Sequence, residues 1–150
     1  MGQRMNPDDY LAMMVPAAQE VCANYHLPWQ VVTAQGALES GWMEYTIGKW
    51  NLFGRKYGGW GNYIECETQE QNEDGSWITI TAKFQDYDSL EQAIEDWCVL
   101  LEQEEVYVNA LAGVDTSDPV AVIEAIGPIY ATDLSYSDKI IQTMKACDLI

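Results

Sequence analysis

The sequence predicts a mostly helical α+β domain with one small β-hairpin lobe. Most of the chain carries apolar residues at spacings of three and four, which is typical of amphipathic helices. Two runs rich in Ile, Thr, Tyr and Trp are joined by Asn72-Glu73-Asp74-Gly75, which predicts a hairpin at about 62–85 with one apolar and one polar face. A length of 150 residues suits one core, so we expect residues 1–150 to form a single domain in which helices surround the hairpin.

The first predicted helix begins at Asn6-Pro7, where an N-cap residue precedes a proline in the first helical turn. Apolar residues follow at helical spacing as far as Tyr25. Pro16 predicts a kink or a break within this stretch. His26, the only histidine, stands just before a proline and is interpreted as a C-terminal cap rather than a base.

The second predicted helix opens at Leu27-Pro28 and stops at Gly41, a residue type that ends helices. Glu39 lies on or beside its apolar stripe. Gly36 within this helix costs about 1 kcal/mol relative to alanine, so we expect another backbone or a substrate to approach closely there.

Four further helices are predicted in the second half of the chain. Ser89 and Gln92 form a capping box before the first of them, and Ser135 is expected to cap the last. Their predicted courses are residue 90 to about Glu104, Val106 to Ala112, Asp118-Pro119 to Gly127-Pro128, and Ser135 onward.

The chain is strongly acidic, with 24 Asp and Glu against 7 Lys and Arg and a formal charge of −17. This charge excludes nucleic acid as a partner bound through phosphates, and it would repel an anionic polymer. Binding to such a polymer would need a local groove of aromatic and hydrogen-bonding groups, and would improve with salt. No apolar run is long enough for membrane insertion, and the start, Met1 to Pro7, lacks the apolar region of a signal peptide.

The cysteines give no support for a metal site, because they lie far apart and form no Cys-x-x-Cys pair. We expect buried thiols, with a disulfide between two helices left open. The four are Cys22, Cys66, Cys98 and Cys147.

One carboxylate stands among apolar residues, in Ala37-Leu38-Glu39-Ser40-Gly41-Trp42. Glu39 falls in the last turn of its predicted helix, where the macrodipole disfavours negative charge, and Leu38 and Trp42 would desolvate it. Both effects raise a carboxyl pKa, as a general acid requires. The alternative is a solvated carboxylate at a frayed helix end.

Residues 43–61 combine five glycines with aromatic side chains and are predicted to form a loop. Tyr57 and Trp60 could stack on the apolar faces of sugar rings or pack the loop against the domain, and both interpretations stay open. Phe53 is interpreted as a core residue.

Ala-Leu-Glu-Ser-Gly-Trp, followed by Asn51-Leu52-Phe53-Gly54, resembles the signature of the bacterial cell-wall glucosaminidases of glycoside hydrolase family 73, in the lysozyme-like superfamily. The resemblance implies a lysozyme-like domain that hydrolyses the β-1,4 bond between N-acetylglucosamine and N-acetylmuramic acid in peptidoglycan glycan strands. Glu39 would protonate the departing oxygen. The resemblance implies no metal or organic cofactor, and we expect a monomer.

Further motifs extend the resemblance. Thr68-Gln69-Glu70 fits the family's Thr-x-Glu pattern, which makes Glu70 the general base or the stabiliser of the transition state; the alternative is an exposed carboxylate on a hairpin. Tyr130-Ala131-Thr132-Asp133 with Tyr136 fits another stretch, in which Tyr130 assists near the reacting centre or is merely a core ring. Gln85 and Arg55 depart from the family pattern. The expected substrate contacts are Asn51, Phe53, Tyr57, Trp60 and Tyr136.

Two rival functions remain at this point. A lysozyme-like cleft could cut on the muramic acid side, as a muramidase or a lytic transglycosylase. The chain could also be a non-catalytic cell-wall-binding or phage structural module. In the leading hypothesis the protein acts on the bacterial cell wall, either extracellularly or delivered by a phage.

Overall fold

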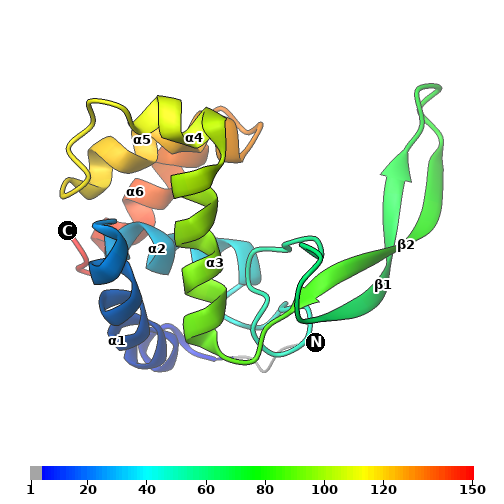
Figure 1. Ribbon diagram of the computed structural model, residues 1–150, viewed down its shortest axis with the longest axis horizontal. Helices are drawn as coiled ribbons and strands as arrows, with labels where there is room; N and C mark the ends of the chain where they lie inside the picture. Colours follow the sequence, from blue (N-terminus) through cyan, green and yellow to red (C-terminus); the bar gives the residue numbers. More distant parts are fainter. Residues whose placement is uncertain (1–4) are drawn as a thin grey trace.

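The computed structural model describes residues 5–150 and confirms a mostly helical α+β fold with one antiparallel hairpin (Figure 1). Met1 to Arg4, part of the segment considered for a signal region, lie outside the described residues. Within residues 5–150 no helix has the length and apolar character needed to cross a membrane. In chain order the elements are α1 (Pro7–Tyr25), α2 (Trp29–Ser40), β1 (Asn62–Gln71), β2 (Trp77–Asp86), α3 (Leu90–Gln103), α4 (Glu105–Leu111), α5 (Pro119–Tyr130) and α6 (Tyr136–Ala146).

The helices form one body around α2, and the hairpin stands to one side of it (Figure 1). Helix α2 packs against α1, α5 and α6, while α3 packs against α1 and α4. Every residue from Val31 to Ala37 is buried, so α2 is covered on all sides rather than along one stripe. Its first turn is half-buried at Trp29 and Gln30, and Leu38 and Glu39 in its last turn are exposed.

The predicted helix ends are largely confirmed. The Asn6 side chain accepts a hydrogen bond from the Asp9 backbone amide at 2.8 Å. His26 caps α1 in the left-handed conformation (φ 54°), and Gly41 caps α2 in the same way (φ 55°). Ser135 occupies the N-cap position of α6, but its side chain makes no capping hydrogen bond and instead donates to Asp133 at 2.7 Å.

The break considered at Pro16 and the helix end predicted at Gly127-Pro128 do not occur. Helix α1 continues through Pro16, and α5 continues through Pro128 to Tyr130. Proline frees the carbonyl four residues earlier, and here Ala12 and Glu124 are exposed, so water can satisfy those carbonyls. The longer α5 places Tyr130 on a helix instead of in a loop.

The close approach expected at Gly36 exists, but a side chain makes it rather than a backbone or a substrate. A Cβ atom at Gly36 would collide with the Tyr10 hydroxyl and would lie 3.2 Å from Leu52. The Tyr10 hydroxyl donates to the Thr33 carbonyl at 2.8 Å in the core. Gly36 therefore serves the packing of α1 against α2.

The hairpin pairs from Asn62 with Asp86 to Gln71 with Trp77, and its distal half projects away from the helices (Figure 1). Its predicted apolar face is buried only near the base, at Phe84. Near the tip, Trp77 is 63% exposed and Ile78 is also exposed. The hairpin thus behaves as an arm attached at its base.

The described cysteines are all free, and Cys22 and Cys98 are buried thiols as predicted. Their sulfur atoms lie 3.8 Å apart between α1 and α3. Cys66 and Cys147 are half-buried.

Candidate active site

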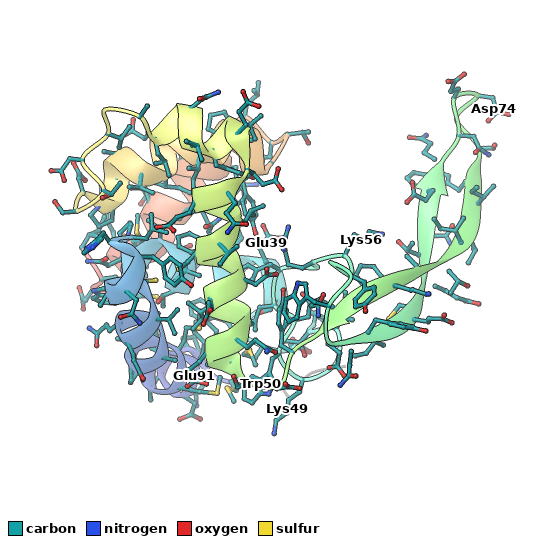
Figure 2. All side chains as sticks on the ribbon, viewed as in Figure 1. Glu39, Lys49, Trp50, Lys56, Asp74 and Glu91 are labelled. Carbon is teal, nitrogen blue, oxygen red and sulfur yellow. The ribbon has the colours of Figure 1, made fainter. Side chains whose placement is uncertain are left out.

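Glu39 lies in the last turn of the buried helix α2, on the side of the body that faces the hairpin (Figure 2). Its predicted burial is wrong, because Glu39 is exposed and Leu38 is 41% exposed. Trp42 packs edge-on against Tyr10, with ring centroids 5.5 Å apart, instead of covering Glu39. Trp42 and Met43 follow Gly41 with φ values of 59° and 74°, so the chain leaves the helix through a left-handed turn.

Tyr136 lies directly beside the carboxyl group of Glu39. Its hydroxyl donates to Glu39 Oε1 at 3.0 Å and accepts a hydrogen bond from Gln35 Nε2 at 2.9 Å. Burial raises the pKa of Tyr136, so its hydroxyl keeps the proton that it donates. Tyr136 was predicted as a substrate contact, but it is 4% exposed and reaches the acid instead.

Tyr130, the last residue of α5, stacks on Tyr136 with ring centroids 5.9 Å apart and an interplanar angle of 11°. Within residues 5–150 no group hydrogen-bonds its hydroxyl. Burial raises the pKa of Tyr130, and the nearby Glu39 carboxylate raises it further. A neutral phenol with a free hydroxyl therefore lies close to Glu39.

A cleft of about 480 Å³ extends from Tyr130. The loop before the hairpin forms one wall, and α3, α4 and α5 supply the other. Two of the predicted substrate contacts, Phe53 and Tyr57, line this cleft, and Phe53 also packs against the core as expected. The lining residues are Phe53, Gly54, Arg55, Lys56, Tyr57, Gly58, Leu100, Tyr107 and Tyr130.

Trp60 lines a different hollow, of about 260 Å³, on the α3 side of the loop. It is exposed and lies against Tyr87, with ring centroids 6.0 Å apart. The structure therefore separates Trp60 from Tyr57, although both belong to the same glycine-rich loop.

Asn51 is buried (1% exposed) and acts within the protein. Its amide donates to the carbonyls of Arg55 and Gln85, both at 3.0 Å, and its Oδ1 accepts from the Arg55 amide at 3.0 Å. These bonds use its polar atoms, so Asn51 shapes the cleft wall and has no free atom for a sugar.

Gln85, which departs from the family pattern, holds the loop to the hairpin. Its side chain accepts from the Gly58 amide at 2.9 Å and donates to the Trp60 carbonyl at 2.8 Å. Beside it, Lys56 forms a β-bridge with Phe84, so residues 55–57 run along the outer edge of β2. The sequence did not predict that Gln85 would bind the backbone of the glycine-rich loop. No local signal pointed to this role, because the loop and Gln85 lie far apart in the sequence.

Two cations line the cleft of this acidic chain. Arg55 Nε donates to Asp96 Oδ2 at 3.3 Å, and the Tyr87 hydroxyl donates to the same oxygen. Lys56 lies 4.5 Å from the Phe84 ring centroid and, in the view of Figure 2, between Glu39 and the hairpin. The residues that line the cleft thus include two cations and no carboxylate, although the whole chain is strongly negative.

Glu70 is exposed on the distal half of the hairpin, where it pairs with Ile78 one step before the last strand pair. Asp74 marks the hairpin tip, which stands apart from Glu39 in Figure 2. No contact joins Glu70 to Glu39 among the described residues. Within this part of the chain, no three His, Cys, Asp or Glu side chains gather as metal ligands would.

Comparisons with known proteins relate most of the chain to one family. A family model described as glucosaminidase, mannosyl-glycoprotein endo-β-N-acetylglucosaminidase, matches residues 15–149. Peptidoglycan hydrolase FlgJ of Pseudomonas aeruginosa is 30% identical over 143 residues, which cover 90% of this chain and 35% of the relative. Exo-glucosaminidase LytG of Bacillus subtilis is 31% identical over 139 residues, 88% of this chain and 48% of the relative. The chain thus spans between a third and a half of these relatives.

Solved structures agree with this relation. The catalytic domain of the autolysin Auto from Listeria monocytogenes superposes with a TM-score of 0.83 at 25% identity, over 98% of this chain and 89% of that one. A C-terminally truncated glycoside hydrolase domain of Salmonella typhimurium FlgJ gives a TM-score of 0.78 at 28% identity, over 97% and 99% of the two chains.

Proposed function

Because this chain belongs to the glucosaminidase family of glycoside hydrolases, we propose that it cuts the β-1,4 bond between N-acetylglucosamine and N-acetylmuramic acid in peptidoglycan. The observation that carries this proposal is the geometry around Glu39. One carboxyl oxygen is held by Tyr136, and the other has no protein partner among the described residues. Tyr130, which stacks on Tyr136, lines the cleft, whereas Glu39 itself lies beside the cleft and is not one of its lining residues. A general acid needs one free oxygen facing its substrate and a fixed orientation.

In the proposed reaction Glu39 gives its proton to the glycosidic oxygen while the bond from that oxygen to the sugar C1 breaks. Positive charge then develops on the sugar ring, and a second group must stabilise it or bind its C1. A water molecule completes the hydrolysis, because its oxygen bonds to C1 and one of its protons returns to Glu39. Glu70 would have to move toward Glu39 with the hairpin arm to do this. Alternatively, the 2-acetamido oxygen of the substrate attacks C1, and Glu70 orients the substrate.

The substrate is anionic, and so is the chain. Lys56 in the cleft wall supports binding of a polymer that carries carboxylates on its lactyl groups and peptides, whereas the charge of Arg55 is paired with Asp96. The remaining surface repels such a polymer, so moderate salt should improve activity on whole walls until it screens the cleft cations as well. We propose the bacterial cell wall as the place of action.

Mass spectrometry of the fragments released from purified cell walls tests the proposal. Reducing-end N-acetylglucosamine is the expected product. Reducing-end or anhydro muramic acid would indicate a muramidase or a lytic transglycosylase, and intact walls with bound protein would indicate a binding module.

Glu39→Gln tests the assignment of the acid, with Glu91→Gln as the matched control. Glu91 is an exposed glutamate in the first turn of α3, away from Glu39 in Figure 2. We expect Glu39→Gln to abolish fragment release and Glu91→Gln to retain it. Full turnover by Glu39→Gln would show that another group is the acid.

A further inference from the structure

A row of three buried polar side chains leads to Glu39 from inside the helical body. Trp97 Nε1 on α3 donates to Gln35 Oε1 on α2 at 2.9 Å, and Gln35 Nε2 contacts the Tyr136 hydroxyl on α6 at 2.9 Å. The Tyr136 hydroxyl contacts Glu39 Oε1 at 3.0 Å. Trp97 is 1% exposed and Gln35 is fully buried. Three helices thus join in one chain of hydrogen bonds that ends at the exposed carboxyl group.

The chemistry of Trp97 sets the direction of every bond in this row. An indole nitrogen only donates, so the Gln35 atom that it meets must be the carbonyl oxygen. The other end of the Gln35 amide is then the NH₂ group, which donates to Tyr136. The single hydroxyl proton of Tyr136 therefore points onward to Glu39 Oε1.

We propose that Trp97, Gln35 and Tyr136 position Glu39 and reserve its second oxygen, Oε2, for the catalytic proton. This inference rests on the proposed role of Glu39 as the acid. Because Oε1 accepts the hydrogen bond from Tyr136, the acidic proton of Glu39 belongs on Oε2. When that proton passes to the glycosidic oxygen, the electron pair of the C1–O bond stays with the departing oxygen, and the new negative charge on Glu39 is stabilised by Tyr136 at Oε1.

This assignment makes Tyr136, Gln35 and Trp97 positioning residues, since none of them touches the sugar. Their effect belongs to the transition state, in which Glu39 becomes an anion. Loss of the row should therefore reduce kcat and leave KM nearly unchanged. A merely structural role would reduce stability without this division between kcat and KM.

The test is a double-mutant cycle on purified peptidoglycan with Tyr136→Phe, Gln35→Met and the double variant. We expect Tyr136→Phe to lower kcat about tenfold or more, as loss of a hydrogen bond to a charged group does, with KM within about twofold of wild type. Gln35→Met should lower kcat in the same direction, and the double variant should be within about twofold of Tyr136→Phe alone, because both changes act on the same bond to Glu39.

Tyr10→Phe is the matched control. It also removes one buried tyrosine hydroxyl, which donates to the Thr33 carbonyl at 2.8 Å, and we expect kcat within about twofold of wild type. Tyr136→Phe keeps the ring that stacks on Tyr130 and should fold. If Gln35→Met does not fold, Trp97→Phe tests the row from its other end, with a smaller loss of kcat expected because Tyr136 remains.

A wild-type kcat for Tyr136→Phe, independent losses in the cycle, or an equal loss in Tyr10→Phe would overturn the inference. Failure of the proposed function looks different: Glu39→Gln would be active, or the wild-type chain would release no fragments, and either result overturns both. If wild type is active, Glu39→Gln is inactive and Tyr136→Phe is normal, only the role of the row is wrong.

Discussion

Replacing Asn51 with leucine should destabilise the cleft wall, because the two side chains have the same number and branching of heavy atoms but only asparagine can hydrogen-bond. The structure shows three bonds of 3.0 Å from Asn51 to the backbone of Arg55 and Gln85. Each buried bond contributes about 1 kcal/mol net, so the substitution should cost about 3 kcal/mol. For a domain of this size, that cost lowers the Tm by about 6 to 12 °C.

Differential scanning calorimetry and steady-state kinetics together check this prediction. Gln69→Leu is the control, since Gln69 is also an amide with a hydrogen bond, to Thr79 at 2.7 Å, but lies exposed on the hairpin. We expect its Tm to change by less than about 2 °C. If Asn51→Leu instead keeps the wild-type Tm and raises only KM, Asn51 contacts the sugar directly and the structural role assigned to it is refuted.

Three further predictions concern charge, backbone and pH. Lys56→Gln should reduce turnover of peptidoglycan about two- to fivefold and spare uncharged N-acetylglucosamine oligomers; equal losses on both would refute a role in recognising carboxylates. Gly41→Ala should cost about 1 to 2 kcal/mol, because φ is 55° there, and an unchanged Tm would contradict this. Burial raises the pKa of Tyr10 and of Tyr136 above that of an unfolded tyrosine, so their contribution to the free energy of unfolding is complete below about pH 10. Above that pH the free energy of unfolding falls by up to about 1.4 kcal/mol per pH unit for each tyrosine. Urea unfolding at pH 10 to 11 should show this slope, reduced in Tyr10→Phe, and an equal slope in that variant would contradict it.

The sequence predicted well those features of the fold that depend only on residues close together in the chain. The Asn6 cap, the Gly41 stop and the hairpin turn each depend on a few neighbouring residues. The prolines misled because their effect depends on which side of the helix meets water. Pro16 and Pro128 both lie on exposed sides, a property of the tertiary structure.

The sequence indicated candidate residues for the site but not how they are arranged. Glu39 was expected to be desolvated by its sequence neighbours, yet the groups that hold it come from elsewhere in the chain. Tyr136 lies 97 residues away from it, and Trp97 lies 62 residues from Gln35. Helical spacing does place Gln35 and Glu39 one turn apart, and this was the one local signal for the row. Partners across such separations follow from packing, which a single sequence does not display.

Of the two carboxylates in the proposed reaction, one lies on a tightly packed helix and the other on an arm that is attached only at its base. Glu39 lies in the last turn of a helix that is buried from Val31 to Ala37, and a row of hydrogen bonds through three helices fixes one of its oxygens. Glu70 lies on an arm whose strands pack chiefly on each other and whose base is joined to the cleft wall through Gln85 and the bridge at Lys56. A fixed acid suits proton transfer, which depends on tenths of an ångström, while a hinged arm lets a long polymer enter before the second group closes on it. In this proposal the base of the hairpin is the hinge, so substitutions at Gln85 should change kcat and KM together, whereas those at Tyr136 should change kcat alone.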